Sequence, residues 1–357
     1  MRRFTSCLEK NMTGEMNGKE SISLMKDNLN AHVTGVKNQI KPPVFIVGAP
    51  RSGTTLMAVL LDRHSNISIG PETQFFTEFI PQNWAEKPPK TYEELVDSAL
   101  AFKRIADFNF DRDQLLHHFK NYDLTVANLL RALIEVHAMR NTKSRPGEKS
   151  PQHLQHIPTI LEHLPEAKII CVLRDGRDVV RSLMETPWAI PNNPRRLRLF
   201  CIRWNDAVER TVHYKKTLPP ARFMTVRFED IVRQPRPELE RICNFIGEEF
   251  EATQLEPAQP SSVIPGWEKQ WKSKASEMLD PGRIEAWRKS SDQKQIWIMN
   301  SMMGTMLERM GYKDTNLNGC PPVTRTKLFI QKVPYLSRLR KVSAASLKVL
   351  KRMKLAR

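Results

Sequence analysis

One segment, residues 44–55, constrains the fold of this chain more than any other. It reads VFIVGAPRSGTT: four apolar residues lead into Gly48, a Pro-Arg-Ser-Gly turn follows, and a helical pattern begins at the two threonines. A strand, a glycine-containing loop and a helix in this order form a phosphate-binding loop, which in nucleoside triphosphate sites reads G-x-x-x-x-G-K-[ST]. Gly48 and Gly53 have that spacing, but Thr54 stands where the lysine would be. The segment therefore predicts a loop that binds phosphate without the usual lysine.

The residues of this loop suit an anion smaller than a triphosphate. Gly53 lets the backbone approach an anion closely, and the N–H groups and dipole of a helix N-terminus favour negative charge. Arg51 adds a permanent positive charge, and hydroxyl donors come from Ser52, Thr54 and Thr55. In a triphosphate site the lysine reaches the β- and γ-phosphates and Mg²⁺ bridges them. Its loss argues against a triphosphate but not against a smaller 5′-anion; the alternative is an ordinary strand-to-helix turn.

A second predicted anion site is the segment LRDGRDVVRS, which ends another apolar strand. Arg174 lies at the end of that strand and Ser182 lies two turns into the next helix, so both side chains can face one phosphate. The alternative is a solvated helix start, in which Asp175 and Asp178 suit the helix dipole and the arginines are on the surface. The carboxyl ends of parallel strands are where α/β sheets bind nucleotides. The two segments together therefore favour a nucleotide site.

Apolar runs and helical periodicity alternate along the chain, which predicts the α/β class with a parallel sheet. The strand at 168–174 has five consecutive apolar residues, as expected for a strand covered on both faces. Residues 64–90 read as loop-rich and 140–153, RNTKSRPGEKSPQH, as irregular. The predicted strands are 44–47, 168–174 and 222–228, and the predicted helices are about 54–62, 91–107, 111–120 and 124–140, the segment after Asp175, and PELERICNFIG.

Charge and composition divide the chain into three predicted parts. Residues 1–41 are polar without periodicity, which predicts a flexible leader, and 42–315 form the predicted folded domain. Residues 316–357 are a basic tail: from Pro321 onward there are 11 Lys or Arg and no Asp or Glu, and the preceding chain carries +6 of the total charge of +17. Apolar residues of the tail share one helical face, which predicts a basic amphipathic helix for an anionic membrane surface. A solvated or nucleic-acid-attracting tail is the alternative, and no specific nucleic acid is predicted as a partner.

Cysteine content and hydropathy indicate the compartment. The five cysteines are irregularly spaced without a C-x-x-C, which fits neither a disulfide framework nor a zinc site and favours a reducing compartment. The first residues are basic but no apolar run follows them, so no secretory signal is predicted. No stretch approaches the roughly 20 apolar residues that span a bilayer. We therefore expect a cytoplasmic protein, with peripheral membrane binding as a second option.

Both anion-binding segments resemble those of a known family, the sulfotransferases. The 5′-phosphosulfate loop of that family is similar to PVFIVGAPRSGTTLMAVLLDRH, and its 3′-phosphate segment is similar to VLRDGRDVVRSLM. The resemblance covers about residues 42–312 and implies a P-loop-type parallel sheet flanked by helices, in a single domain with a helical insertion. It also implies 3′-phosphoadenosine 5′-phosphosulfate (PAPS) as the co-substrate, without a metal. PAPS has a phosphate at each end of its ribose and no triphosphate, which would explain the missing lysine.

Within the family, the chain most resembles the tyrosyl-protein sulfotransferases and the bacterial enzymes related to them. In that branch a Gly-x-Glu-Thr segment follows the loop and a Lys-x-Pro segment precedes the second strand; this chain has GPETQFF at 70–76 and EKSPQH at 148–153. By position, the resemblance implies that Glu72 is the general base and Lys149 the donor-activating lysine. It assigns Arg51 to the phosphosulfate, and Arg174 and Ser182 to the 3′-phosphate.

These residue types suit sulfuryl transfer, an in-line displacement at sulfur. A carboxylate such as Glu72 can take the proton that the acceptor hydroxyl loses. Arg51, Lys149 and the loop N–H groups can stabilise the charge that grows on the leaving phosphate. Ordinary surface positions are the alternative for Glu72 and Lys149. A later segment, WEKQWKSKASEMLDPGRIEAWRKS, resembles the part that covers the donor in the family, which implies that Lys272 and Lys274 reach the phosphosulfate.

The acceptor side departs from the pattern of that branch. The arginines that follow its Glu-Thr pair, and that suit acidic peptides, are replaced by Gln74 and Glu78. Its cysteine pair is missing, with Ile69 and Gly147 nearby, and its donor-contacting tyrosine corresponds to Phe228. The acceptor is therefore left open as a hydroxyl or an amine.

Two other functions stay open. A small-molecule kinase on the same scaffold is disfavoured by Thr54, and by Arg174, since no convincing Walker-B aspartate ends the second strand. An anion-binding or membrane-surface protein without enzymatic activity would rest on the basic tail. The histidine pairs at 117–118 and 153–156 lack the neighbouring ligands of a metal site, so no metal is predicted.

Overall fold

The computed structural model describes residues 40–80, 91–186, 193–256, 263–268 and 279–329. All of them except residues 40 and 41 belong to one unit that begins at Pro42. The predicted leader up to residue 39, and the predicted amphipathic helix beyond residue 329, lie outside the described residues. The boundaries of the three parts therefore stay predictions.

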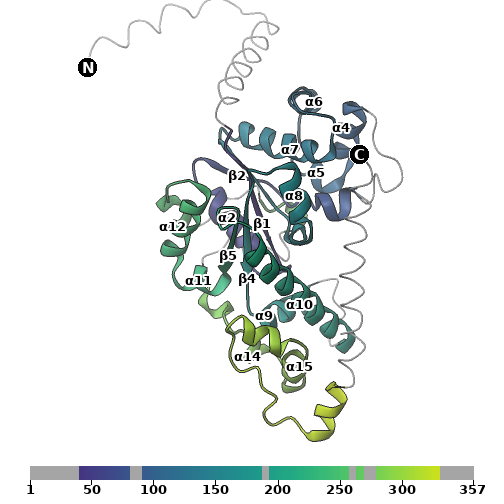
Figure 1. Ribbon diagram of the computed structural model, residues 1–357, viewed down its shortest axis with the longest axis vertical. Coiled ribbons are helices and arrows are strands. Elements are labelled where there is room, and N and C mark those ends of the chain that lie inside the picture. The colour runs from purple at the N-terminus through teal and green to yellow at the C-terminus, as the bar shows by residue number, and fades with distance from the viewer. Residues whose placement is uncertain (1–39, 81–90, 187–192, 257–262, 269–278, 330–357) are drawn as a thin grey trace, which may run out of the picture. The chain divides into compact units, whose positions relative to one another are not determined.

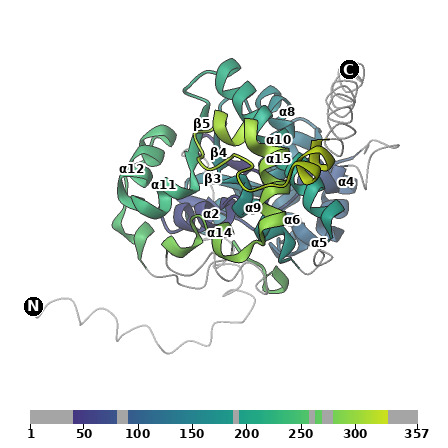
Figure 2. The same ribbon diagram turned by 90° about the horizontal axis from the view of Figure 1, so that it is seen from below.

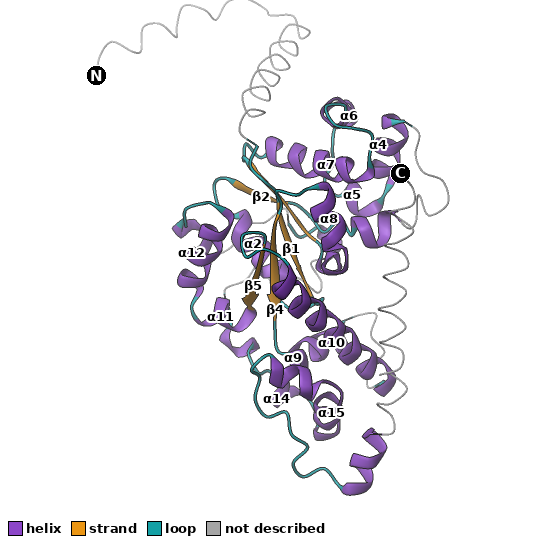
Figure 3. Cartoon of the chain, in the orientation of Figure 1, coloured by secondary structure: helices purple, strands orange, loops and turns teal. Residues whose placement is uncertain are grey.

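A parallel sheet lies at the centre of this unit (Figures 1 and 3). Its strands are β1 (Val44–Gly48), β2 (Ile67–Ile69), β3 (Arg145–Lys149), β4 (Lys168–Leu173) and β5 (Phe223–Arg227). Their order is β2-β3-β1-β4-β5, and all the pairings are parallel. The middle strand is β1, where Val44 is in register with Gly147 on one side and Lys168 on the other. The predicted α/β class with a parallel sheet is confirmed.

Helices cover both faces of this sheet, which explains why every residue of β1 is buried. The helices of the first face are α2 (Thr54–Asp62), α11 (Phe228–Arg233) and α12 (Pro235–Ile246). On the second side α10 (Pro194–Thr217) contacts the sheet, α9 (Gly176–Met184) and α15 (Gln293–Arg309) pack against α10, and α8 (Ile157–His163) lies on the same side (Figure 2). One apolar cluster joins α2, α11 and α12 to the sheet, and a second cluster surrounds Trp204 of α10. Figure 2 shows α11 and α12 on the side of the sheet opposite to α8 and α10.

A helical insertion separates β2 from β3, and the family resemblance implies such an insertion. It consists of α4 (Tyr92–Ala101), α5 (Lys103–Ala106), α6 (Arg112–Phe119) and α7 (Val126–Arg140). Side chains cap three of these helices at their N-termini, because Thr91, Asp111 and Thr125 each accept a backbone N–H from the residue three positions later. The single helix predicted over 91–107 is wrong in one respect: the extended backbone of Phe102 divides it into α4 and α5.

β2 and β3 are absent from the predicted strands, because their residues read as loop. β2 has only three residues, too few for a periodic signal. β3 reads RPGEK, which lacks an apolar run, yet all of its residues are buried. Tertiary partners make this burial possible: Arg145 forms an ion pair of 2.7 Å with Glu248, while Glu148 and Lys149 bind side chains of the segment after β2. Buried polar residues with specific partners from distant segments are invisible to a hydrophobic pattern.

None of the described helices is long and apolar enough to cross a membrane. Six short elements complete the described chain. They are η1 (Phe75–Phe79), η2 (Pro151–His156), η3 (Ala252–Leu255), η4 (Gly266–Glu268), η6 (Pro281–Arg283) and α14 (Trp287–Ser290).

Candidate active site

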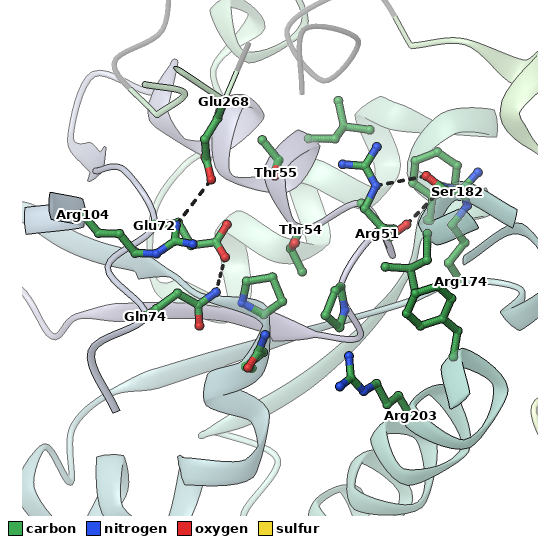
Figure 4. Close-up of a pocket in the computed structure, with 18 of the residues that line it drawn as sticks. Arg51, Thr54, Thr55, Glu72, Gln74, Arg104, Arg174, Ser182, Arg203 and Glu268 are labelled. Carbon is green, nitrogen blue, oxygen red and sulfur yellow. Dashed lines mark hydrogen bonds and ion pairs between the residues drawn. The ribbon is translucent and has the colours of Figure 1, made fainter. Parts of the chain in front are cut away.

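A cavity of about 460 Å³ opens at the carboxyl ends of the strands (Figure 4). Its walls come from the loops after β1, β2, β3 and β4, from α10, and from residues near η4 and η6. β1 lies between β3 and β4, and the chain leaves β1 towards one edge of the sheet and leaves β3 towards the other. Such a switch in direction is where open α/β sheets bind ligands.

The loop after β1 has the backbone of an anion site. Gly53 has a φ of 103°, and a Cβ at this position would lie 2.5 Å from the ring of Phe228. Arg51 also has a positive φ, of 71°. Among the described residues no side chain caps the start of α2, and Thr54 and Thr55 both line the cavity. The N–H groups of the first helical turn therefore suit an anion bound in the cavity.

The second predicted anion site lies directly against the first. Arg51 Nε donates a hydrogen bond of 3.0 Å to Ser182 Oγ. Arg174 donates to the carbonyl oxygens of Arg51, at 3.2 Å, and of Arg283, at 2.7 Å, and its guanidinium lies 4.3 Å from the ring of Phe228. The structure thus brings together three predicted residues and adds Arg283, which no sequence pattern singled out.

The electrostatics at this end of the cavity favour an anion. Burial lowers the pKa of Arg174 to about 10, and Asp178 offsets this effect only in part. Burial and the neighbouring Arg283 likewise lower the pKa of Arg51. Within the described part of the chain, no group forms a hydrogen bond with the buried atoms Ser52 Oγ and Arg174 Nε. Buried polar atoms of this kind are normally satisfied, so they indicate a missing partner.

The segment after β4 contradicts one alternative from the sequence, a solvated helix start. The segment after Arg174 is not a solvated helix start, because Asp175, Arg177 and Asp178 are all buried. Arg177 pairs with Asp175 at 2.7 Å and lies 4.0 Å from the ring of Trp287. Asp178 accepts the backbone N–H groups of Glu285 and Trp287, each at 2.9 Å. These contacts fix the segment that carries Arg283.

The predicted catalytic pair lies at the other end of the cavity. Lys149 Nζ donates to Glu72 Oε2 at 2.6 Å, and Lys149 is fully buried. Gln74 Nε2 donates to the other oxygen of the same carboxylate, as Figure 4 shows. A carboxylate and an ammonium group in contact, at the edge of a cavity with anion-binding groups, can exchange a proton with one ligand and stabilise charge on another.

The helical insertion supplies a residue that the sequence analysis missed, Arg104 of α5. Its guanidinium lies beside Glu72 in Figure 4 and forms ion pairs with Glu78, at 3.0 Å, and Glu268, at 3.4 Å. Burial would lower the pKa of Arg104, but Glu72 and Glu78 outweigh burial and raise it. Trp267 packs against the same guanidinium at 5.3 Å. No local motif marks Arg104, because its partners come from two distant segments, the one after β2 and η4.

Two further predictions have different outcomes. Lys272 and Lys274 lie outside the described residues, so their assignment to the donor stays a prediction.

Ile69 and Gly147, which stand near the places of the missing cysteines, are register partners in β2 and β3. A Cβ on Gly147 would lie 2.2 Å from Ile69 Cδ1, so the Ile69 side chain fills this position. Where the structure describes the chain, no three His, Cys, Asp or Glu side chains gather as a metal site.

Several known proteins are similar to this chain. A family model described as "Sulfotransferase family" matches residues 42–252. Protein-tyrosine sulfotransferase A of Caenorhabditis elegans is 24% identical over 80% of this chain and 70% of its own length. A putative protein-tyrosine sulfotransferase of Caenorhabditis briggsae is 26% identical over 59% of this chain and 68% of that protein. Protein-tyrosine sulfotransferase 2 of Gallus gallus is 26% identical over 63% of this chain and 56% of its own length.

Two solved structures share the fold. One is the sulfotransferase domain of the Synechococcus PCC 7002 olefin synthase, with a TM-score of 0.55 and 21% identity over 77% of this chain and 96% of that one. The other is a sulfotransferase domain from the curacin biosynthetic pathway, with a TM-score of 0.53 and 21% identity over 77% of this chain and 99% of that one.

Proposed function

The chain belongs to the sulfotransferase family, and from this premise we propose that it moves a sulfuryl group from PAPS to a hydroxyl or an amine. One observation carries the choice of donor. The Arg51–Ser182 hydrogen bond of 3.0 Å joins the two anion sites in a single cavity, as a ligand with two separate anionic groups requires.

The residues of the cavity fit such a donor. Arg51, the buried Ser52 hydroxyl and the first turn of α2 would hold the 5′-phosphosulfate, while Arg174 and Ser182 would hold the 3′-phosphate. The fit is supported by Arg174, which lines the cavity and whose Nε has no hydrogen-bond partner among the described residues. Arg283 adds a further positive charge at the same end of the cavity. Bound PAPS would supply an activated sulfuryl group with a phosphate leaving group.

The chemistry assigned to this chain rests on Glu72 and Lys149. In the structure the ammonium of Lys149 neutralises the carboxylate of Glu72 at 2.6 Å, which disfavours proton uptake by that carboxylate. An anionic ligand beside Lys149 offers its Nζ atom a second negative partner. Glu72 is then the better base, and it accepts the proton of the acceptor hydroxyl as the new bond forms. Lys149 and Arg51 stabilise the negative charge of the leaving group.

A hydroxyl is the first acceptor to test, because the named relatives act on protein tyrosine. The acceptor side of this cavity differs from a simple basic surface. Gln74 and Glu78 line it, and the nearby Arg104 is bound by Glu78 and Glu268. This arrangement supports a polar acceptor pocket without naming the compound that fills it.

The kinase alternative has less support. The residue that follows β4 is Arg174, whose side chain binds the loop carbonyl of Arg51. A Walker-type site would need a carboxylate there to hold Mg²⁺, and a lysine in place of Thr54.

Ligand preference tests the proposal. We expect adenosine 3′,5′-bisphosphate to raise the melting temperature of the protein in the presence of EDTA, and ATP with Mg²⁺ to have little effect. Stabilisation grows with the ratio of ligand concentration to Kd, so saturating ligand gives a clear shift. A shift with ATP and Mg²⁺ but none with the bisphosphate would overturn the proposed donor.

A further inference from the structure

Directly behind the catalytic pair lies a second carboxylate, Glu148, which no part of the proposed chemistry uses. Glu148 is 1% exposed, and no described Lys or Arg forms an ion pair with its carboxylate. Burying a carboxylate is costly unless several hydrogen bonds compensate for lost hydration. The carboxylate therefore needs an explanation from its contacts.

Oε1 of Glu148 binds two hydroxyl groups. Thr73 Oγ1 donates to it at 2.8 Å and Ser150 Oγ at 2.5 Å. The Ser150 oxygen in turn accepts the backbone N–H of Gln74 at 2.9 Å, and Thr73 Oγ1 accepts that of Phe75 at 3.2 Å. One carboxylate oxygen thus orients two hydroxyls that hold two successive backbone amides.

Oε2 of Glu148 faces a histidine with a defined proton. His153 Nε2 accepts the backbone N–H of Phe76 at 3.3 Å, so Nε2 carries no proton. The proton is then on Nδ1, which lies 3.0 Å from Glu148 Oε2. Burial would raise the pKa of Glu148, but His153 and the Ser150 and Thr73 hydroxyls outweigh it and lower the pKa. The hydrogen bonds to Glu148 thus come from the two hydroxyls at Oε1, while Oε2 lies within 3.0 Å of His153 Nδ1 without a hydrogen bond among the described residues.

The contacts pair two neighbouring residues of one segment with two neighbouring residues of another. Glu72 meets Lys149, and the next residue, Thr73, meets Glu148. Successive side chains of a strand point to opposite faces. Lys149 at the end of β3 therefore reaches Glu72, which lines the cavity, while Glu148 points to the opposite side. The first pair belongs to the proposed chemistry, and the second lies one residue behind it.

The sheet itself holds the segment 70–74 only weakly. The pairing of β2 with β3 covers three residues and ends at Ile69, before the catalytic segment begins. Beyond it, the backbone of Gln74 is in the left-handed region, with a φ of 49°. Hydrogen bonds to Glu148, Ser150 and His153 therefore replace strand pairing in this segment.

We propose that Glu148 is a positioning residue, which fixes the segment 72–76 through Thr73, Ser150 and His153 and thereby holds Glu72 where it meets Lys149. The proposal rests on the proposed function only for the role of Glu72; the hydrogen-bond network itself is independent of it. Displacements of about 1 Å in catalytic groups can lower turnover by about 10²-fold, which makes such a support worth its cost in burial.

A matched pair of variants tests the network. Thr73→Val keeps the shape of the side chain but removes its hydroxyl, whereas Thr73→Ser keeps the hydroxyl. Glu148→Gln is the second disruptive variant, in case the first folds poorly. Thr211→Val is the control, because Thr211 is an equally buried threonine whose hydroxyl bonds within α10 and to Cys171.

Two measurements keep failure of this proposal apart from failure of the proposed function. The first is hydrogen exchange of a peptide that covers 72–79. We expect about tenfold faster exchange at the Gln74, Phe75 and Phe76 amides in Thr73→Val and Glu148→Gln, and wild-type exchange in Thr73→Ser and Thr211→Val. Wild-type protection in both disruptive variants would overturn the proposal, whether or not the enzyme transfers sulfate.

The second measurement separates binding from turnover. With labelled PAPS and the best acceptor found, the disruptive variants should lose about 10²-fold in single-turnover rate, with the Kd for adenosine 3′,5′-bisphosphate changed less than about twofold. Thr73→Ser should restore the rate. Fast exchange together with an undiminished rate would show a structural support without a positioning role, and would overturn the proposal. If the wild-type protein transfers no sulfate, the proposed function fails, and hydrogen exchange still decides whether Glu148 holds the segment.

Discussion

Arg174 shows how one side chain serves several parts of the candidate donor site. It is buried, binds the carbonyls of Arg51 and Arg283, and lies over the ring of Phe228. Removing a surface arginine costs a protein little stability. A buried arginine that binds two loops, as Arg174 does, holds those loops at a fixed distance from each other. The lowered pKa of Arg174 reflects the same burial, and an anion would offset its cause.

Removing either predicted 3′-phosphate ligand should weaken binding of adenosine 3′,5′-bisphosphate. We expect Arg174→Ala and Ser182→Ala each to cost about 1–3 kcal/mol, since each removes hydrogen bonds to a charged group. Calorimetric titration measures this, with the exposed Arg195→Ala as the control. Affinity equal to wild type in both variants would mean that the 3′-phosphate assignment is wrong.

A single substitution also tests whether Glu72 is the general base. Glu72→Gln keeps the shape of the side chain, and the amide oxygen can still accept from Lys149, so the affinity for the bisphosphate should change little. The single-turnover rate should fall by about 10²–10⁴-fold, the usual contribution of a general base. Glu78→Gln is the matched control, because Glu78 lines the same cavity but is bound to Arg104. Transfer at the wild-type rate in Glu72→Gln would remove this residue from the mechanism.

At the scale of elements, the segment from η6 to α14 depends on Asp178 of α9. That carboxylate accepts the N–H groups of Glu285 and Trp287, and burial raises its pKa from 3.8 to about 6. Between these two pH values the folded protein holds more protons on Asp178 than the unfolded chain does. The contribution of Asp178 to stability is therefore larger at low pH and falls as the pH rises from about 4 to about 6.

Asp178→Asn tests this, because an amide does not titrate. The difference in free energy of unfolding, wild type minus variant, should fall by roughly 1–3 kcal/mol between pH 4 and pH 6, and should be constant above pH 7. Urea unfolding at each pH gives the difference, and other titrating groups cancel in it. A difference that is flat across this range, or that rises with pH, would contradict the raised pKa.

Elements with a local signal were predictable, and elements that depend on distant partners were not. β1, β4 and β5 have apolar runs, and α2 begins and ends where the sequence predicts. β3 has no such signal, because Arg145, Glu148 and Lys149 are buried only through their partners at Glu248, Thr73 and Glu72. The missed strand carries the residues next to the proposed chemistry, so propensity fails where function demands buried polar groups.

At the scale of the whole molecule, the site is a meeting of loops from separate parts of the chain. Motifs and a family resemblance point to Arg51, Glu72, Arg174 and Ser182, which line one cavity, and to Lys149, which is buried behind Glu72 and pairs with it. They do not locate Arg104, which the insertion contributes, or Arg283, which the segment held by α9 contributes. Arg104 has no pattern around it, and the resemblance of residues 267–290 to the donor-covering part of the family points to Lys272 and Lys274 rather than to Arg283.

The most direct test of the account is transfer of label from ³⁵S-PAPS to acceptors by the wild-type protein in EDTA, with Glu72→Gln as the blank. The acceptors are matched phenols, alcohols and amines, tyrosine peptides, carbohydrates and hydroxylated lipids. We predict that at least one acceptor is labelled by the wild-type protein, and that the Glu72→Gln variant labels it about 10²-fold or more slowly. Equal labelling by both proteins, or no labelling of any acceptor by a wild-type protein that binds adenosine 3′,5′-bisphosphate, would contradict it.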